Sequence, residues 1–395
     1  MKSEYTLLGF GRLREAFRQL TLVISSLLLF STLGCCDLRN DFYPLGIYSV
    51  PTTNDLQIVR EAGFNLVTGS ANKAYLDAAQ ALGLKVLASP NTSAGSDFDA
   101  EAVRRAVLAF DPHPALWAWY LVDEPDLHNI PPETVQSAHR FLKTLPARKP
   151  TALVICQGSQ ALHYANITDI TMIDRYPISW LPLANFSQHV RLARLALGKK
   201  KPLIAVIQSF DWSYYPELLP NEKNLRPPTF AELRSMTYAA LTQGANGIFY
   251  YCFADSRWNI LDHPQSWDAL LSVVHEVNDR RLLFQAEHIW WPHEHEYGDP
   301  TVRFNAALEA SISMVLLRVR KGDQSIPVGD YILTVNTTDQ THRYHFRLPS
   351  LLTGTLPVLG ENRSVEIEDN WMADRFEPFA VHVYGPWDGM KPEVR

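Results

Sequence analysis

Two adjacent carboxylates are the residues of this chain whose types and position most directly suggest chemistry. Asp123 and Glu124 end an apolar, aromatic run over residues 116–122, and a proline follows them. Unpaired charge is costly to bury, so packing alone does not explain two acids at the end of a buried strand. Neighbouring carboxyl groups raise each other's pKa, and partial burial adds to that rise. The pair is therefore a candidate for general acid–base chemistry, with Glu124 as the proton donor.

The elements that must position these acids alternate regularly from residue 43 onward. Strands are expected over residues 43–50, 64–70, 84–89, 116–122, 151–157, 170–175, 203–208 and 247–253. Helices are expected over residues 54–62, 73–82, 99–110, 132–145, 159–164, 186–197, 229–242 and 266–283. The strands are rich in Val, Ile and Leu, as in parallel sheets that are covered on both faces. Eight such units predict an α/β fold, a (β/α)₈ TIM barrel over residues 42–292.

The pattern changes in the last hundred residues. Short β-rich runs separated by polar turns occupy residues 306–318, 331–336, 342–348, 364–367 and 380–384. Such spacing is typical of an antiparallel sandwich. We therefore expect a C-terminal all-β sandwich domain over residues 297–395.

The mouth of the predicted barrel gathers residues suited to carbohydrate chemistry, because the carboxyl ends of all eight strands meet there. Cleavage of a glycosidic bond needs a proton donor and a second carboxylate or an activated water molecule. We predict Glu124, Asp123 and Asp174 as the catalytic residues. Polar and aromatic residues that follow the strands are predicted to bind substrate: Tyr48, Gln157, Tyr176, Gln208, Trp212, Tyr251 and Trp258.

This arrangement resembles the clan A glycoside hydrolases, a superfamily of retaining TIM-barrel enzymes. That family keeps an Asn-Glu-Pro motif at the end of strand four, and its Glu is the acid/base. Here Asp123-Glu124-Pro125 is similar, with Asp in place of Asn. The family's aromatic residue at the end of strand eight would correspond to Tyr251 or Phe253. The resemblance covers the chain from about residue 43 to its end, including the appended sandwich, and only the Glu-Pro motif is specific.

One departure from the family leaves three alternatives open. The family's nucleophile is a Glu at the end of strand seven, where this chain has Gln208, and an amide does not form the covalent intermediate. The second carboxylate is then Asp174, Asp211 or Asp255. Alternatively, Asp123 orients the acetamido group of an N-acetyl sugar in substrate-assisted cleavage, which resembles the Asp-Glu pair of the hexosaminidases. The third alternative is a catalytically inactive barrel that binds glycans.

The first 36 residues look like a targeting signal. Basic residues precede an apolar stretch over residues 20–30. Four further residues, 31–34, lead from this stretch to Cys35 and Cys36. This pattern resembles a bacterial lipoprotein signal with Cys35 as the lipidated residue and Cys36 as the alternative. Cleaved secretion and an uncleaved anchor are the other interpretations. Each one predicts an exported protein of the cell envelope, in contact with the membrane only through this segment.

The composition of the chain narrows the classes of molecule that the protein is expected to bind. The net charge is −6 without a basic stripe, which argues against nucleic-acid binding, whereas 10 Trp and 16 Tyr suit a carbohydrate partner. We expect no cofactor and no metal, because the His and Glu residues of 293–296 lack the helical spacing of a metal site. Cys156 and Cys252 are expected to be buried free thiols. A lyase or isomerase is disfavoured, since the chain shows neither metal-binding carboxylates nor a phosphate-binding loop.

Overall fold

The computed structural model describes residues 42–90, 95, 98–164, 166–289, 311–347, 354–369 and 371–387. The predicted signal segment, its Cys35 and Cys36, and the His/Glu stretch over 293–296 lie outside these ranges. Within them, no helix combines the length and apolar character needed to cross a membrane.

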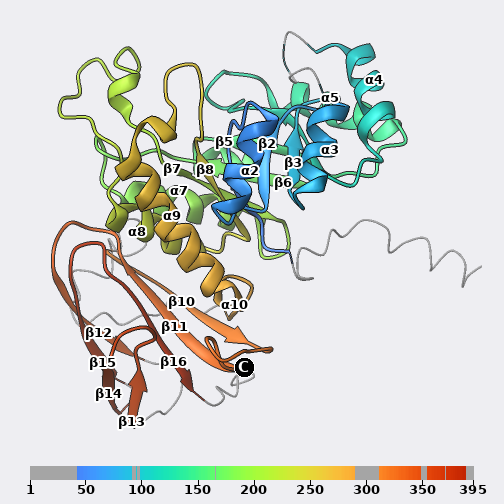
Figure 1. Cartoon of the computed structure of the whole chain (residues 1–395). Coiled ribbons are helices and arrows are strands. Elements are labelled where there is room, and N and C mark those ends of the chain that lie inside the picture. The colour runs from blue at the N-terminus through green and yellow to red at the C-terminus, as the bar shows by residue number, and fades with distance from the viewer. Residues whose placement is uncertain are drawn as a thin grey trace, which may run out of the picture. The chain divides into compact units, whose positions relative to one another are not determined.

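Eight parallel strands form a closed barrel in chain order, which confirms the predicted fold class (Figure 1). The strands are β1 (Leu45–Ile47), β2 (Leu66–Gly69), β3 (Lys85–Ala88), β4 (Leu116–Val122), β5 (Thr151–Ile155), β6 (Ile170–Asp174), β7 (Leu203–Gln208) and β8 (Gly247–Tyr251). Several are shorter than expected at their carboxyl ends. The residues that follow them leave the ladder and are free to line the barrel mouth.

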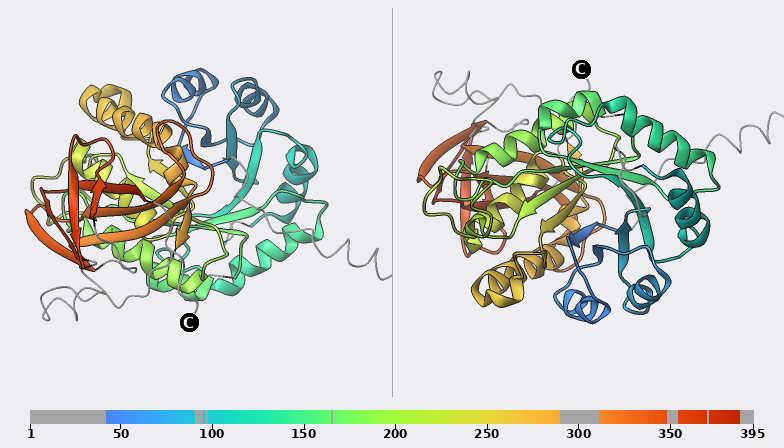
Figure 2. Two further views of the ribbon diagram at one scale, coloured as in Figure 1. Left: turned by 90° about the horizontal axis from the view of Figure 1, so that it is seen from below. Right: turned by 90° about the horizontal axis from the view of Figure 1, so that it is seen from above.

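Helices surround the barrel strands, as the two views along the vertical direction show (Figure 2). They are α2 (Thr53–Glu61), α3 (Lys73–Ala81), α4 (Ala100–Phe110), α5 (Pro132–Thr144), α6 (Ala161–Tyr164), α7 (Ala184–Leu197), α8 (Phe230–Thr242), α9 (Pro264–Asp279) and α10 (Arg281–Phe284). Helix α8 begins with a capping box, in which Thr229 and Glu232 satisfy each other's backbone N–H groups. The last expected helix is divided in two at Arg280.

The C-terminal region consists of two four-stranded antiparallel sheets, as expected for a sandwich. Their strands are β9 (Glu287–Ile289), β10 (Ile312–Val319), β11 (Gly329–Asn336), β12 (His342–Arg347), β13 (Gly354–Pro357), β14 (Ser364–Glu368), β15 (Trp371–Phe376) and β16 (Val381–Trp387). One sheet has the order β16-β11-β10-β9, and the other has the order β12-β15-β14-β13. Strand β9 precedes the expected domain boundary at residue 292 yet pairs with β10, so the barrel segment contributes one strand to this sheet.

The sheet that contains β11 is covered on both faces. Ile332 of β11 packs with Phe376 in the core between the two sheets, whereas Leu333 belongs to the core shared with the barrel. The hydroxyl Oγ of Ser235 in α8 donates to the backbone oxygen of Asn336 over 3.1 Å. Strand β11 is therefore buried along almost its whole length, and it lacks the alternation of a sheet with one solvated face.

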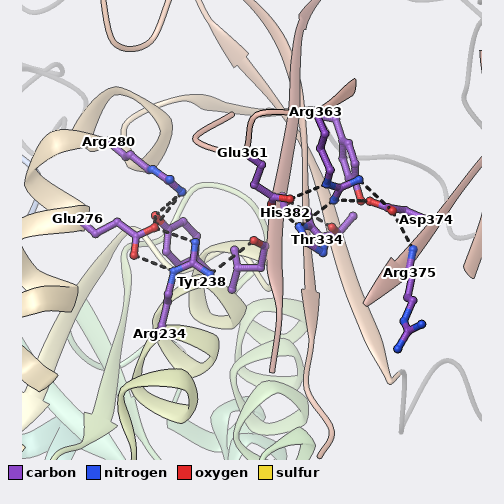
Figure 3. A network of polar contacts seen from close by, with 12 residues as sticks. Arg234, Tyr238, Glu276, Arg280, Thr334, Glu361, Arg363, Asp374, Arg375 and His382 are labelled. Atoms are coloured by element: carbon purple, nitrogen blue, oxygen red, sulfur yellow. Dashed lines mark hydrogen bonds and ion pairs between the residues drawn. The ribbon is translucent and has the colours of Figure 1, made fainter. Parts of the chain in front are cut away.

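Charged side chains continue this interface (Figure 3). Arg234 of α8 pairs with Glu276 of α9, with 2.7 Å between Nε and Oε2. On the sandwich side, Arg363 binds Asp374, with 2.8 Å between Nη2 and Oδ2, and His382 contacts Glu361. These partly buried groups are paired, which removes most of the cost of burying them.

Candidate active site

Glu124 stands at the end of β4 in an unusual backbone conformation. Its φ is +39°, in the left-handed region that residues with a side chain rarely adopt. Its carbonyl oxygen accepts hydrogen bonds of 3.0 Å from the N–H groups of Leu127 and His128, which fixes the tight turn after the strand. Such strained positions cost about 1–3 kcal/mol and cluster at functional sites. The turn holds the Glu124 side chain at the mouth instead of along the strand.

Three carboxyl groups converge around this turn. The Asp174 side chain, at the end of β6, lies beside the carboxyl group of Glu124 and the hydroxyl of Tyr176 and interacts with both. Asp123 is more exposed than its neighbour Glu124, and its Oδ1 accepts a hydrogen bond from the hydroxyl of Tyr120. The structure thus brings together all three residues predicted to be catalytic.

Electrostatics favour protonated forms in this cluster. Burial, and then the neighbouring Asp123 charge, raise the pKa of Glu124. Burial, and then the charge of Glu124, raise the pKa of Asp174 well above its usual range. Asp123 is exposed as a residue, but the surrounding protein desolvates its carboxyl group and raises its pKa, against the opposing effect of the Tyr120 hydrogen bond. A raised pKa is what a general acid needs in order to hold its proton near neutral pH.

Aromatic rings form a wall beside the carboxyl groups. The ring centroid of Tyr251 lies 5.7 Å from that of Tyr48 and 5.5 Å from that of Tyr176. Trp212 continues the wall, with its centroid 6.4 Å from Tyr176. All four rings were expected to contact substrate, and they come from the ends of β1, β6, β7 and β8. Flat apolar surfaces next to acids suit the apolar faces of sugar rings.

Several solved structures share the fold of this chain. A glycoside hydrolase family 5 structure from Bacteroides vulgatus matches with a TM-score of 0.57 at 12% identity, over 90% of this chain and 90% of that chain. A structure described as a glycoside hydrolase gives 0.55 at 11% identity, over 87% and 92%. AmyP in complex with maltose gives 0.53 at 10% identity, over 90% and 100%. This protein has the fold of the TIM-barrel glycoside hydrolases.

Identities this low establish the shared fold alone. No protein-family model matches the sequence, and no curated protein matches it. The roles of individual residues in this glycoside hydrolase fold must therefore come from their own contacts.

Gln208 holds a loop in this hydrolase-like barrel. It is fully buried, and its Oε1 accepts a 2.8 Å hydrogen bond from the Ile178 N–H. Its Nε2 donates to the carbonyl oxygen of Ile178 and, over 3.2 Å, to that of Phe210. This placement corrects the expectation that Gln208 contacts substrate, because backbone groups already occupy both ends of its amide.

The other expected sources of a second carboxylate also have structural partners. Asp255 accepts hydrogen bonds from the hydroxyl groups of Tyr215 and Tyr251, over 2.5 Å and 3.2 Å, and these bonds help to lower its pKa despite burial. Asp211 caps a short helical turn through the Ser213 N–H. Trp258 is 1% exposed and stacks on His263, so it is not the substrate platform expected from the sequence. Of Asp174, Asp211 and Asp255, Asp174 is the carboxyl that interacts with Glu124.

Asp126 is a structural residue of the site that the sequence analysis did not identify. Its Oδ2 accepts hydrogen bonds from the backbone N–H groups of Cys156 and Gln157, over 3.2 Å and 2.8 Å. It thereby ties the turn that follows Glu124 to the end of β5 and places the half-buried Gln157 beside the mouth. In the sequence, the sign of this role is an acid directly after the Glu-Pro motif. That acid does not reveal its partners unless the register between β4 and β5 is known.

The cysteines have no special chemistry in this arrangement. Cys156 and Cys252 are buried and free, as expected, and burial raises the pKa of both thiols. Within the described ranges, no group of three or more His, Cys, Asp or Glu side chains is arranged to hold a metal ion.

Proposed function

We propose that this protein hydrolyses O-glycosidic bonds of an oligo- or polysaccharide, with Glu124 as the general acid/base. The observation that carries the proposal is the position of Glu124 on a strained turn at the mouth of a glycoside hydrolase barrel, with a raised pKa beside an aromatic wall. Its protonated carboxyl would protonate the leaving oxygen as the anomeric C–O bond breaks. Tyr48, Gln157, Tyr176, Trp212 and Tyr251 are proposed to bind the sugar.

The separation of the carboxyl groups favours one form of this reaction. Retaining enzymes with a carboxylate nucleophile keep their two carboxyls about 5–5.5 Å apart, and inverting enzymes about 6.5–9.5 Å apart. Asp174 lies next to Glu124, where the two carboxyl groups interact directly. Two carboxyl groups in direct contact do not leave space between them for a sugar carbon or a water molecule.

This geometry supports substrate-assisted cleavage of an N-acetyl sugar as the favoured mechanism. The acetamido oxygen of the substrate would form a bond to the anomeric carbon while Glu124 protonates the departing oxygen. The ionised Asp123 would accept the acetamido N–H and increase the nucleophilicity of the acetamido oxygen. Water would then open the resulting ring, with Glu124 taking up the proton. Asp123 is suitably placed, on the exposed side of Glu124 and held by Tyr120.

The direct test is turnover of a panel of N-acetyl and plain glycosides by the wild type and by Glu124→Gln. We expect the variant to fold normally and to lose about 10²–10⁴-fold in kcat/KM, the usual contribution of a general acid. Full activity in this variant would exclude Glu124 as the acid. Glycan affinity without cleavage by the wild type would favour the alternative, a non-catalytic glycan-binding protein.

A second variant distinguishes substrate-assisted cleavage from cleavage with a carboxylate nucleophile. Asp123→Asn should strongly reduce cleavage of N-acetyl glycosides, because the amide no longer draws the acetamido N–H toward a negative charge. If the protein cleaves plain glycosides as fast as N-acetyl glycosides, the substrate-assisted mechanism is refuted and the nucleophile lies elsewhere.

The cellular location of the protein is proposed from its N-terminal sequence. The segment over residues 1–36 supports export to the bacterial cell envelope, with lipidation at Cys35 as the proposed anchor. Labelling of the expressed protein with a fatty-acid analogue, in the wild type and in Cys35→Ala, tests it. Label retained in Cys35→Ala but lost in Cys36→Ala would move the acceptor to Cys36, and no label in the wild type would refute lipidation.

A further inference from the structure

Asp174 has an environment that is unusual for a carboxylate. It is 5% exposed, and its Oδ1 is buried with no hydrogen-bond partner among the described residues. Its side-chain contacts are the carboxyl of Glu124 and the hydroxyl of Tyr176. Arg175, the adjacent cation in the chain, instead binds Asn185, with 2.7 Å between Nε and Oδ1.

The groups that surround this pair are mostly acidic or phenolic. Those with the largest influence on Asp174 and Glu124 are Asp123, Asp126 and His128 from the end of β4 and the turn after it, and Tyr176 from the end of β6. Tyr48 from β1, and Cys156 from the end of β5, also face the two carboxyl groups. An ionised Asp174 would bury an unpaired negative oxygen next to two further acids, whereas a protonated Asp174 avoids this cost.

We propose that Asp174 and Glu124 share one proton, and that Asp174 is a positioning residue that holds this proton for Glu124. The Asp174 O–H donates to the Glu124 carboxylate, and the proton crosses this hydrogen bond before Glu124 passes it to the leaving oxygen. The electron pair of the broken C–O bond stays on that oxygen, and the attacking water later returns a proton to the pair. The catalytic part of this inference rests on the proposed function, whereas the shared proton does not.

A shared proton has a consequence for stability with a defined sign. The folded protein binds this proton at pH values where the unfolded chain has released it, so folding stability decreases as pH rises above the ordinary carboxyl range. Asn at position 174 is a permanent mimic of the protonated acid, since its amide N–H donates to Glu124 without carrying a titratable proton. Asp174→Asn should therefore remove this penalty.

Asp111 provides a matched control, because it is another buried Asp of the same barrel, 2% exposed. It lies before β4, at the end opposite the mouth, and accepts hydrogen bonds from Trp119 Nε1 over 2.8 Å and from the Arg148 N–H over 2.7 Å. These donors are N–H groups, so an amide at this position would lose a hydrogen-bond acceptor. Asp111→Asn should lower the midpoint temperature of unfolding.

The experiment measures the midpoint temperature of the wild type, Asp174→Asn and Asp111→Asn between pH 5 and pH 8. We expect Asp174→Asn to exceed the wild type at pH 8 by about 1–3 °C, with a difference that shrinks toward pH 5. Asp111→Asn should lie below the wild type without gaining on it as the pH rises. If Asp174→Asn is destabilised like the control, or fails to fold, Asp174 is an ordinary ionised structural residue and the inference is overturned.

A second measurement follows the pH profile of kcat/KM on any glycoside that the wild type cleaves. The wild type should lose activity where the pair gives up its last proton, and Asp174→Asn should lose it at a pH lower by about one unit or more. An unmoved alkaline limb would refute the role of Asp174 in holding the proton. If no glycoside is cleaved, the proposed function fails, and the stability comparison still decides whether the proton is shared.

Discussion

The buried amide of Gln208 gives the sharpest prediction about the mouth of this barrel. Gln208→Glu would restore the residue type that clan A enzymes use as nucleophile. We expect it to destabilise the protein without creating activity, because the side chain is buried and both ends of its amide are occupied by backbone groups.

The expected size of this effect follows from three hydrogen bonds. One carboxyl oxygen of the new Glu keeps the bond from the Ile178 N–H. The other oxygen replaces Nε2 and faces the carbonyl oxygens of Ile178 and Phe210, so two donated bonds are lost. A protonated Glu recovers one of them, and we expect a loss of about 1–2 kcal/mol. An ionised Glu recovers neither and adds buried charge, which raises the loss to about 3–5 kcal/mol.

The difference between the two protonation states sets the pH dependence. The folded-state pKa of the new Glu is raised, so stability is lost as pH rises above the unfolded value of about 4.3. Urea unfolding at pH 5 and pH 8 measures this effect. Gln80→Glu, on the exposed side of α3, is the control and should change stability by less than about 0.5 kcal/mol. Equal stability of Gln208→Glu and the wild type at pH 8, or new hydrolysis, would refute the loop-anchor role.

Two further predictions concern carboxyl groups that are held by hydrogen bonds. Glu232 is buried, and contacts with Arg226 and Thr229 lower its pKa despite burial, so its contribution is present at neutral pH and lost in acid. Glu232→Gln should therefore cost about 1–2 kcal/mol at pH 7 in urea unfolding, discounted because Arg226 is half exposed, and the difference should shrink as Glu232 becomes protonated in acid; a difference that does not change as the pH falls would contradict the ion pair. Tyr120→Phe removes the donor that lowers the pKa of Asp123, so the acid limb of kcat/KM should move to higher pH, and an unmoved limb would show that Asp123 does not act as a carboxylate.

Much of the fold could be predicted from the sequence because its local signals agree. Apolar strands alternate with helices eight times, and the expected segments 116–122 and 203–208 coincide with β4 and β7. Strands β13 and β15 were missed because they are short or carry several polar residues. Strand β9 was missed because only its pairing with β10 makes it a strand.

The site was less predictable, because it depends on the directions of side chains and on the registers between strands, which a sequence does not contain. Glu124 could be identified from the acid pair at a strand end, but its contact with Asp174 depends on how β4, β5 and β6 are aligned. All residues of β7 are buried, so no alternation of exposed and buried positions indicates where Gln208 points. Asp126 and Asp255 are acids in loops whose partners are backbone N–H groups and tyrosines far away in the chain.

The central claim, that Glu124 protonates the leaving group, is tested most directly by leaving-group dependence. Wild type and Glu124→Gln would be compared on two aryl glycosides of the same sugar, one with a strongly acidic phenol and one with a weakly acidic phenol. The weakly acidic phenol needs protonation to depart, so we expect Glu124→Gln to lose far more rate on this substrate, by about 10²–10⁴-fold, than on the other. An equal loss on both substrates, or no loss on either, would contradict the assignment of Glu124 as the general acid.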